Sequence, residues 1–291
     1  MKKTTLILGC GDIGTVLGKE LHGAGHRVVG VRRDARELAD TVIEGVSADL
    51  GDAEALAALP DADILVYVVS ADRFEEEAYR AAYPDGLKAV LAEFAERAQA
   101  PRHIFFVSSP VSTPSRTARS STRRARQNQG FSGKLMREAE QALIEHRLPG
   151  SVVRFSGIYG PGRDRLIRQV GEGRIAAATP TMYSNRIHRD DCAGVLAHLV
   201  DRALAGETLH ELYLASDCEP APIHEVMTWL ARQLKVESSE TIQSPLRRRA
   251  SKRCDNTRLL ESGYRFRYPS YREGYAQVLR AGGYLPDPAM G

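Results

Sequence analysis

The stretch Leu6-Ile7-Leu8-Gly9-Cys10-Gly11-Asp12-Ile13-Gly14 joins a short apolar run to a pattern of helical spacing. Strand, glycine-rich turn and helix, with the spacing G-x-G-x-x-G, is the context that a dinucleotide site requires. The first glycine permits the tight turn, the second lets the backbone approach a pyrophosphate, and the third allows close helix–strand packing. The helix N-terminus would offer N–H groups and a partial positive charge to the phosphates. We therefore expect the pyrophosphate to contact Gly9, Cys10, Gly11, Asp12, Ile13 and Gly14.

On both sides of this turn, apolar runs of strand length alternate with helical patterns. Strands followed by helices indicate parallel βαβ units with right-handed crossovers. The predicted fold is α/β, a Rossmann-type doubly wound parallel sheet with a smaller C-terminal substrate lobe. The dinucleotide-binding domain is expected at 1–160 plus roughly 184–216, and the substrate lobe at roughly 161–183 plus 217–291. Strands are expected at 5–8, 27–31, 64–69, 103–107, 151–155 and 212–215, and helices at 14–24, 53–59, 85–98, 133–146, 191–205 and 223–234.

The composition is that of a globular protein, with 43% hydrophobic and 26% charged residues. No apolar run approaches the ~20 residues needed to cross a bilayer, and the first one is too short for a signal peptide. The four cysteines are widely spaced and form no Cys-x-x-Cys pair, which favours reduced thiols over disulfides or a zinc site. We expect a cytoplasmic protein without a membrane partner or a metal.

The second predicted strand ends on Arg32-Arg33, where an NAD-specific site would carry an acid for the ribose hydroxyls. An arginine fork suits a 2′-phosphate, so NADP is the preferred cofactor. Asp34 follows slightly too late, but it keeps NAD possible. Asp49-Leu50 could place a carboxylate near the adenine, or could form a capping turn, and both alternatives stay open.

Several further motifs carry a resemblance to a known family. They are the runs 66–71 and 106–109, the phrase Arg154…Ile158-Tyr159-Gly160-Pro161-Gly162, and the run 186–191. With the glycine turn, they resemble the extended short-chain dehydrogenase/reductase superfamily, in its epimerase/dehydratase branch, over nearly the whole chain. The resemblance implies a nicotinamide cofactor and a C-terminal lobe that closes over a sugar-nucleotide-like substrate. It adds Val68, Val69, Ser70 and Ser108 to the expected cofactor site, and Tyr159, Arg186 and His188 to the expected substrate site.

The catalytic set of that family is incomplete here. The family uses a Tyr-x-x-x-Lys pair and a nearby Ser or Thr, with the lysine lowering the pKa of the tyrosine. Lys134 matches the lysine, but the tyrosine position is Gly130 and the Ser/Thr position is Pro110. This departure resembles the atypical members of the superfamily. Lys134 could still bind the nicotinamide ribose. His188 could act as an acid or be structural, and Tyr159 and Tyr183 are candidate replacement proton donors.

Residues 110–130 differ from the rest of the chain. They hold five arginines and no acid, which accounts for more than the whole net charge of +3. Three explanations compete: a phosphate or nucleic-acid site, a loop over the active site, or a compensated frameshift. We favour the frameshift, because rereading suitable codons one base earlier can continue Ser108-Ser109 as Thr-Gly-Val-Tyr, a phrase that resembles the family at this point. Nucleic acid is therefore not an expected partner.

Together these features predict an NAD(P)-binding epimerase/dehydratase-like oxidoreductase that acts on a nucleotide-sugar or similar polar small molecule. The alternative is a catalytically silent NADP(H)-binding redox sensor, which the absent tyrosine would favour. An intact substrate lobe favours the enzyme, because a sensor needs no substrate pocket. Whether the protein forms a homodimer stays open.

Overall fold

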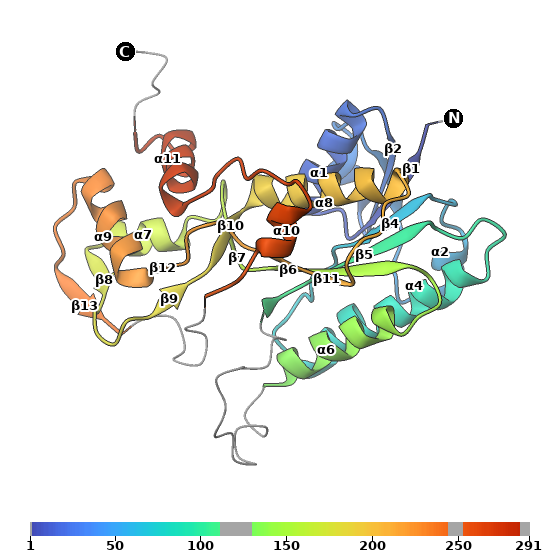
Figure 1. The fold of residues 1–291 in the computed structure, drawn as a ribbon, viewed down its shortest axis with the longest axis horizontal. Coiled ribbons are helices and arrows are strands. Elements are labelled where there is room, and N and C mark those ends of the chain that lie inside the picture. The colour runs from blue at the N-terminus through green and yellow to red at the C-terminus, as the bar shows by residue number, and fades with distance from the viewer. Residues whose placement is uncertain (1, 111–129, 244–252, 286–291) are drawn as a thin grey trace. The chain divides into compact units, whose positions relative to one another are not determined.

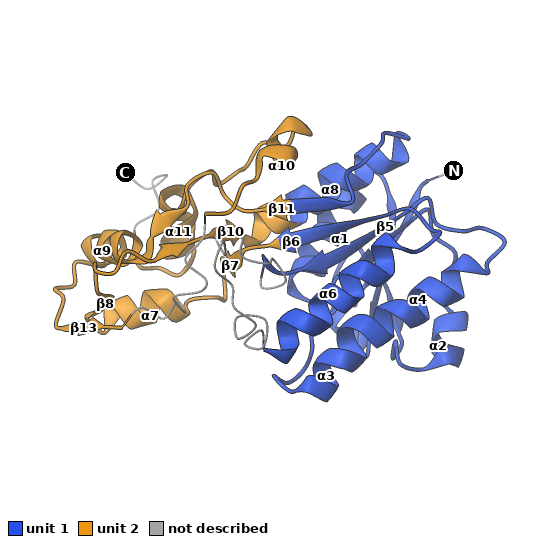
Figure 2. Ribbon diagram, turned by 60° about the horizontal axis from the view of Figure 1, so that its bottom comes forward, with its two compact units in different colours: residues 1–154, 193–213 blue, residues 155–192, 214–291 orange. Residues whose placement is uncertain are grey.

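The computed structural model describes residues 2–110, 130–243 and 253–285 (Figure 1). Apart from its two end residues, the arginine-rich segment 110–130 lies outside these ranges, so its three explanations stay predictions. The chain divides into two compact units. Unit 1 comprises residues 1–154 and 193–213, and unit 2 comprises residues 155–192 and 214–291 (Figure 2). The domain boundaries expected near 160, 184 and 216 thus differ from these limits by three to nine residues.

A seven-stranded sheet forms the centre of unit 1, in the order β11-β6-β5-β4-β1-β2-β3. Every pair from β3 through to β6 is parallel, and the prediction of a Rossmann-type α/β fold is confirmed. The order reverses at β1, which lies between β2 and β4, and the crevice at such a reversal is where open α/β sheets bind ligands. The strands are β1 (Thr4–Leu8), β2 (Arg27–Arg32), β3 (Glu44–Ser47), β4 (Ile64–Tyr67), β5 (His103–Ser108), β6 (Gly150–Phe155) and β11 (Leu212–Ala215).

Helices cover both faces of this sheet, as its buried apolar strands require. In Figures 1 and 2, α1 (Asp12–Gly23) and the unit 1 part of α8 (Arg189–Leu204) lie on one face. The other face carries α2 (Ala53–Ala57), α4 (Gly86–Ala95) and α6 (Phe131–Ile144), with α3 (Glu76–Arg80) beside α6. Side chains from α4, α6 and the strands form one core there, including Leu91, Phe94, Phe106, Ala139 and Leu143.

Most predicted elements of unit 1 differ from their expected limits by one or two residues, and the helix and strand around Pro84 and Val68 show why. The helix expected over 85–98 is preceded by α3 and a π-helical turn at Ala81–Asp85, and it ends at Ala95. Pro84 lies inside that turn, where it can donate no backbone hydrogen bond. The strand expected over 64–69 ends at Tyr67, and the backbone of the next two residues packs against Gly9 of the glycine turn.

Unit 2 is built from short strand pairs and helices around a smaller core. β7 (Gly157–Tyr159) pairs with β10 (Arg186–His188), β8 (Arg174–Ala176) with β13 (Glu240–Ile242), and β9 (Tyr183–Ser184) with β12 (Ala221–Pro222). Its helices are α7 (Arg165–Gly171), α9 (Ile223–Leu234), α10 (Thr257–Glu261) and α11 (Tyr271–Ala281). The apolar face of α9, with Val226, Met227 and Leu230, is fully buried in this core. Across the described ranges, no helix is both long and apolar enough to span a membrane.

Candidate functional site

The glycine turn has the geometry that close approach of a ligand backbone requires. Gly9 has φ +86°, and a Cβ there would lie 2.8 Å from the Val69 backbone, so only glycine fits. A Cβ on Gly14 would lie 3.0 Å from Ile7 Cγ2, which explains the tight contact of α1 with β1. Gly11, by contrast, has nothing closer than 4.0 Å. It is the N-cap of α1 and makes no side-chain cap, so the helix N-terminus offers its N–H groups to an anion.

The two arginines at the end of β2 lie beside this turn. Arg32 Nη1 donates to the Cys10 carbonyl at 3.4 Å, and its Nη2 pairs with Glu37 at 2.6 Å. Arg33 makes two hydrogen bonds of 2.7 Å to the carboxylate of Asp72, which follows β4. This pairing raises the pKa of the Arg33 guanidinium and lowers the pKa of Asp72. The end of β2 therefore presents two charged guanidinium groups, of which Arg32 contacts the glycine turn and Arg33 contacts Asp72.

The acidic residues weighed for the ribose or the adenine have local partners. Asp34 caps the 3-10 helix at Ala35–Leu38 and pairs with Arg36 at 2.7 Å, which lowers the pKa of Asp34. Asp49 accepts a hydrogen bond from Gly51 N at 2.9 Å, as in a turn, and the neighbouring Leu50 packs on the core. Neither carboxylate is oriented by a contact with the glycine turn.

Backbone rather than side chains brings the end of β4 to the site. Val68 N donates to the Leu8 carbonyl at 2.8 Å, and Val69 backbone atoms face Gly9. Val68 is buried, Val69 is half-buried and Ser70 is exposed. Val68 and Val69 therefore lie against the turn, and Ser70 is the most exposed of the three.

Lys134 and Ser108 have different surroundings. Lys134 is exposed in the first turn of α6, and Gly130 is the N-cap of that helix. Ser108 is buried at the end of β5, and its hydroxyl donates to Glu140 Oε1 at 2.5 Å. Arg154 donates to both oxygens of the same carboxylate, at 2.8 and 2.5 Å. Ser108 therefore holds α6 to the sheet, and its hydroxyl is directed to the interior.

Glu140 is the residue of this network that the sequence analysis missed. It lies on the face of α6 that carries Met136, Ala139 and Leu143, all buried. An acid in the apolar stripe of an amphipathic helix is the signal that could have identified it. The buried charge of Glu140 needs a cationic partner, and Arg154 of β6 provides it. Arg154 is the register partner of Ser108 on β5, so both side chains reach the same carboxylate.

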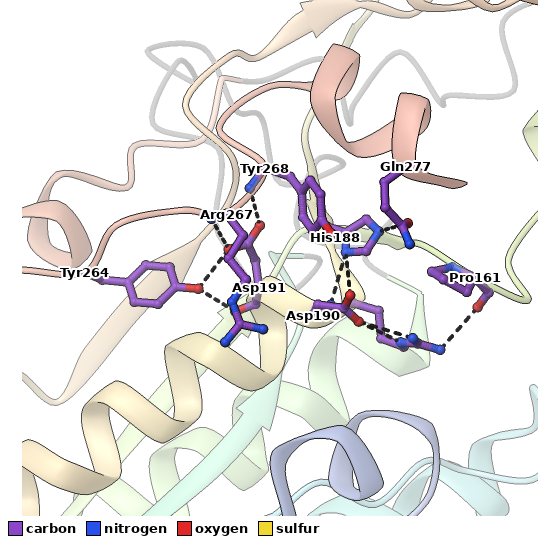
Figure 3. Close-up of polar contacts among 9 residues, drawn as sticks. Pro161, His188, Asp190, Asp191, Tyr264, Arg267, Tyr268 and Gln277 are labelled. Carbon is purple, nitrogen blue, oxygen red and sulfur yellow. Dashed lines mark hydrogen bonds and ion pairs between the residues drawn. The ribbon is translucent and has the colours of Figure 1, made fainter. Parts of the chain in front are cut away.

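The three expected substrate residues lie together inside unit 2. His188 is opposite Tyr159 in the β10–β7 pair, with ring centroids 5.3 Å apart. His188 Nδ1 accepts from Asp190 N and Nε2 donates to Gln277 Oε1, both at 3.2 Å (Figure 3). Burial lowers the pKa of His188, so the ring is neutral and orders the start of α8. These contacts are those of a structural histidine.

Asp191 anchors the same helix start. Its carboxylate accepts from Tyr264 Oη at 2.8 Å and from the backbone N–H groups of Arg267 and Tyr268 at 2.8 and 3.0 Å (Figure 3). The side chain is completely buried. It therefore ties the aromatic C-terminal stretch to the run 186–191.

A second polar cluster of unit 2 contains Tyr159, Arg186 and Asp217. The Tyr159 hydroxyl, Arg186 Nη1 and Asp217 Oδ2 are buried and have no hydrogen-bond partner within the described ranges. Burial raises the pKa of Asp217 to about 7 and raises the pKa of Tyr159 further above its usual range. A phenol with a raised pKa stays protonated, which disfavours Tyr159 as a group that exchanges protons. The other candidate, Tyr183, packs its ring under the Arg253 guanidinium, 4.2 Å from the ring centroid.

Within the described ranges, no three His, Cys, Asp or Glu side chains are grouped as a metal site. The features that fit a ligand best are the open Gly11, the uncapped start of α1 and the adjacent arginines. They suit a phosphate-bearing dinucleotide.

Comparisons with known proteins support a nicotinamide cofactor. A family model described as NAD(P)H-binding matches residues 9–203. No curated protein matches the chain significantly. A Methylobacillus flagellatus protein assigned to the NAD-dependent epimerase/dehydratases is 32% identical, with a TM-score of 0.76, over 97% of this chain and 100% of that one.

Two more distant structures share the fold. Human epimerase family protein SDR39U1, solved with NADPH, is 20% identical with a TM-score of 0.74, over 95% of this chain and 99% of that one. The Bordetella bronchiseptica enzyme WbmH, solved with NAD+, is 16% identical with a TM-score of 0.73, over 97% and 100%. Sheet order, glycine turn and these matches lead to one conclusion: the chain belongs to the NAD(P)H-binding proteins of the extended short-chain dehydrogenase/reductase type, with the fold of the epimerase/dehydratase branch.

Proposed function

We propose that this protein binds NADP(H) in preference to NAD(H) and is an atypical epimerase/dehydratase-like oxidoreductase of a polar small molecule, such as a nucleotide-sugar. The observation that carries the cofactor preference is the position of Arg32, whose guanidinium touches the carbonyl of Cys10 in the phosphate turn. A planar guanidinium suits a 2′-phosphate, and the neighbouring acids, Asp34 and Glu37, pair with Arg36 and Arg32.

Each residue of the proposed site has a distinct task. The nicotinamide group, when bound, would accept or donate the hydride. The glycine turn and the start of α1 would bind the pyrophosphate, Arg32 and Arg33 the 2′-phosphate, and Lys134 the nicotinamide ribose. Gly130 carries no side chain and Pro110 carries no hydroxyl, so the standard proton-transfer set is incomplete. We expect turnover far below the normal enzyme range, because losing an acid–base group costs on the order of a hundredfold or more.

The second candidate is a redox sensor that binds NADP(H) without turnover. Gly130 at the N-cap of α6 favours it, because the tyrosine that would work with Lys134 is absent. Under either proposal the protein works in the cytoplasm. Thiols that stay reduced are typical of that compartment, and among the described residues no disulfide joins Cys10, Cys192, Cys218 or Cys254.

A thermal-shift panel with NADPH, NADH and sugar nucleotides tests the proposal, because a ligand that binds only the folded state raises its stability. NADPH should raise Tm more than NADH, and the double variant Arg32→Ala/Arg33→Ala should lose most of the NADPH effect and little of the NADH effect. Equal losses for the two cofactors would refute the preference. A sugar nucleotide that raises Tm would favour the enzyme over the sensor, and normal turnover on it would show that another residue has replaced the tyrosine.

A further inference from the structure

We propose that Asp72 is a specificity residue of the cofactor site: its carboxylate holds the guanidinium of Arg33 and so weakens the binding of a 2′-phosphate. This inference rests on the proposed function, because it takes Arg33 to be part of the cofactor site. It assigns to the loop after β4 a role in choosing between NADP(H) and NAD(H) that the sequence around β2 does not reveal.

The contact is bidentate and bridges two strands. Arg33 Nη1 donates to Asp72 Oδ2 and Nη2 donates to Oδ1, both at 2.7 Å. Arg33 follows β2 and Asp72 follows β4, and in the sheet these strands lie on either side of β1. The ion pair therefore spans the carboxyl end of β1, where the glycine turn begins and where a doubly wound sheet places its dinucleotide.

Other nearby acids have different partners. Glu37 pairs with Arg32 at 2.6 Å, Asp34 pairs with Arg36 at 2.7 Å, and Asp49 accepts from Gly51 N. Asp72 is thus the carboxylate that orients Arg33. The Asp72 carboxylate accepts from the two terminal nitrogens of the Arg33 guanidinium, and a 2′-phosphate would bind the same two N–H groups. A 2′-phosphate must displace this carboxylate to bind Arg33, whereas the ribose hydroxyl of NAD(H) requires no such exchange.

The size of the effect follows from exposure. The side chains of Arg33 and Asp72 are 68% and 58% exposed, so solvent screens the pair and its strength is that of a surface ion pair. Breaking such a pair changes an equilibrium by up to about fivefold. Removing the carboxylate also removes its repulsion of the phosphate. We therefore expect Asp72→Asn to tighten NADPH binding by about three- to tenfold and to change NADH binding by less than about twofold.

Titration of the full-length chain with NADPH and NADH, by calorimetry at low and moderate salt, measures both affinities. Glu44→Gln is the matched control. Its carboxylate forms a bidentate pair with Arg27 that is also half-exposed, but at the opposite end of β2. The control should change neither affinity. The gain in NADPH affinity from Asp72→Asn should fall below twofold in an Arg33→Ala background, and it should shrink as the salt concentration rises.

Unchanged or weaker NADPH binding by Asp72→Asn would overturn the inference, as would an equal gain for NADH or a full gain in the Arg33→Ala background. The Arg32→Ala/Arg33→Ala variant separates this from the proposed function. If that variant loses NADPH binding selectively and Asp72→Asn gains nothing, only the role of Asp72 fails. If it loses both cofactors equally, the NADP preference itself fails.

Discussion

The buried carboxylate of Glu140 offers a test of what holds α6 to the sheet. Its side chain is 4% exposed, accepts a hydrogen bond from Ser108 and pairs with Arg154, which is 12% exposed. Glu140→Ala would remove the carboxylate that pairs with the buried Arg154 guanidinium and that accepts the hydrogen bond of Ser108. Removing one partner of a buried ion pair costs about 3–5 kcal/mol of unfolding free energy. For a cooperative unit of this size, that lowers Tm by about 6–20 °C.

Glu138 is a matched control on the same helix. It also pairs with cations, Lys88 at 2.7 Å and Arg80 at 3.5 Å, but its side chain is 38% exposed. Glu138→Ala should therefore cost no more than about 1 kcal/mol. Both variants introduce alanine in α6, so the change in helix propensity is common to them.

Urea unfolding followed by far-ultraviolet circular dichroism measures the difference. Glu140→Ala should unfold at a clearly lower urea concentration than Glu138→Ala. The double variant Glu140→Leu/Arg154→Met should be less destabilised than Glu140→Ala, because it buries no unpaired charge. If the two alanine variants agree within about 1 kcal/mol, the buried ion pair of Glu140 and Arg154 does not stabilise unit 1.

Three further predictions concern the site and its pH dependence. Gly9→Ala should destabilise the protein by at least about 1–2 kcal/mol, because Gly9 has φ +86°. The same variant should abolish NADPH binding in calorimetry, and retained affinity would contradict the role of the glycine turn. Gly130→Tyr should fold normally, since a Cβ at this position meets none of the described atoms within 4 Å. The variant should raise reductase turnover about a hundredfold if Lys134 is positioned to assist the new tyrosine, and unchanged turnover would argue against that role of Lys134. Urea unfolding from pH 4 to 8 should show opposite slopes for two buried groups. Burial lowers the pKa of His103 from 6.5 to about 4, so its contribution to stability is lost as pH falls through that window, and His103→Gln should remove the loss. Burial raises the pKa of Asp217 from 3.8 to about 7, so stability is lost as pH rises through that window, and Asp217→Asn should remove this loss; variants that keep the wild-type slopes would contradict both assignments.

Much of unit 1 could be predicted because its signals are local. The run 6–14 contains its own strand, turn and helix start, and the structure places a positive φ at Gly9 as the turn requires. The alternation of apolar runs with helical patterns likewise predicted the doubly wound sheet, which is confirmed. In unit 2, the helix expected over 223–234 matches α9 at both ends, because a single apolar stripe decides which face is buried.

The sequence by itself thus determined the fold class, the family and the position of the glycine turn, since these depend on local motifs and on the alternation of strands and helices along the chain. Only the tertiary structure decided the partners of the charged groups. Arg33 meets Asp72 from 39 residues further along the chain, and Glu140 meets Ser108 from 32 residues before it. Such pairs form because parallel strands bring their carboxyl ends to one edge and because a buried charge must be compensated wherever the packing places it. Periodicity carries no information on which distant side chain will do so.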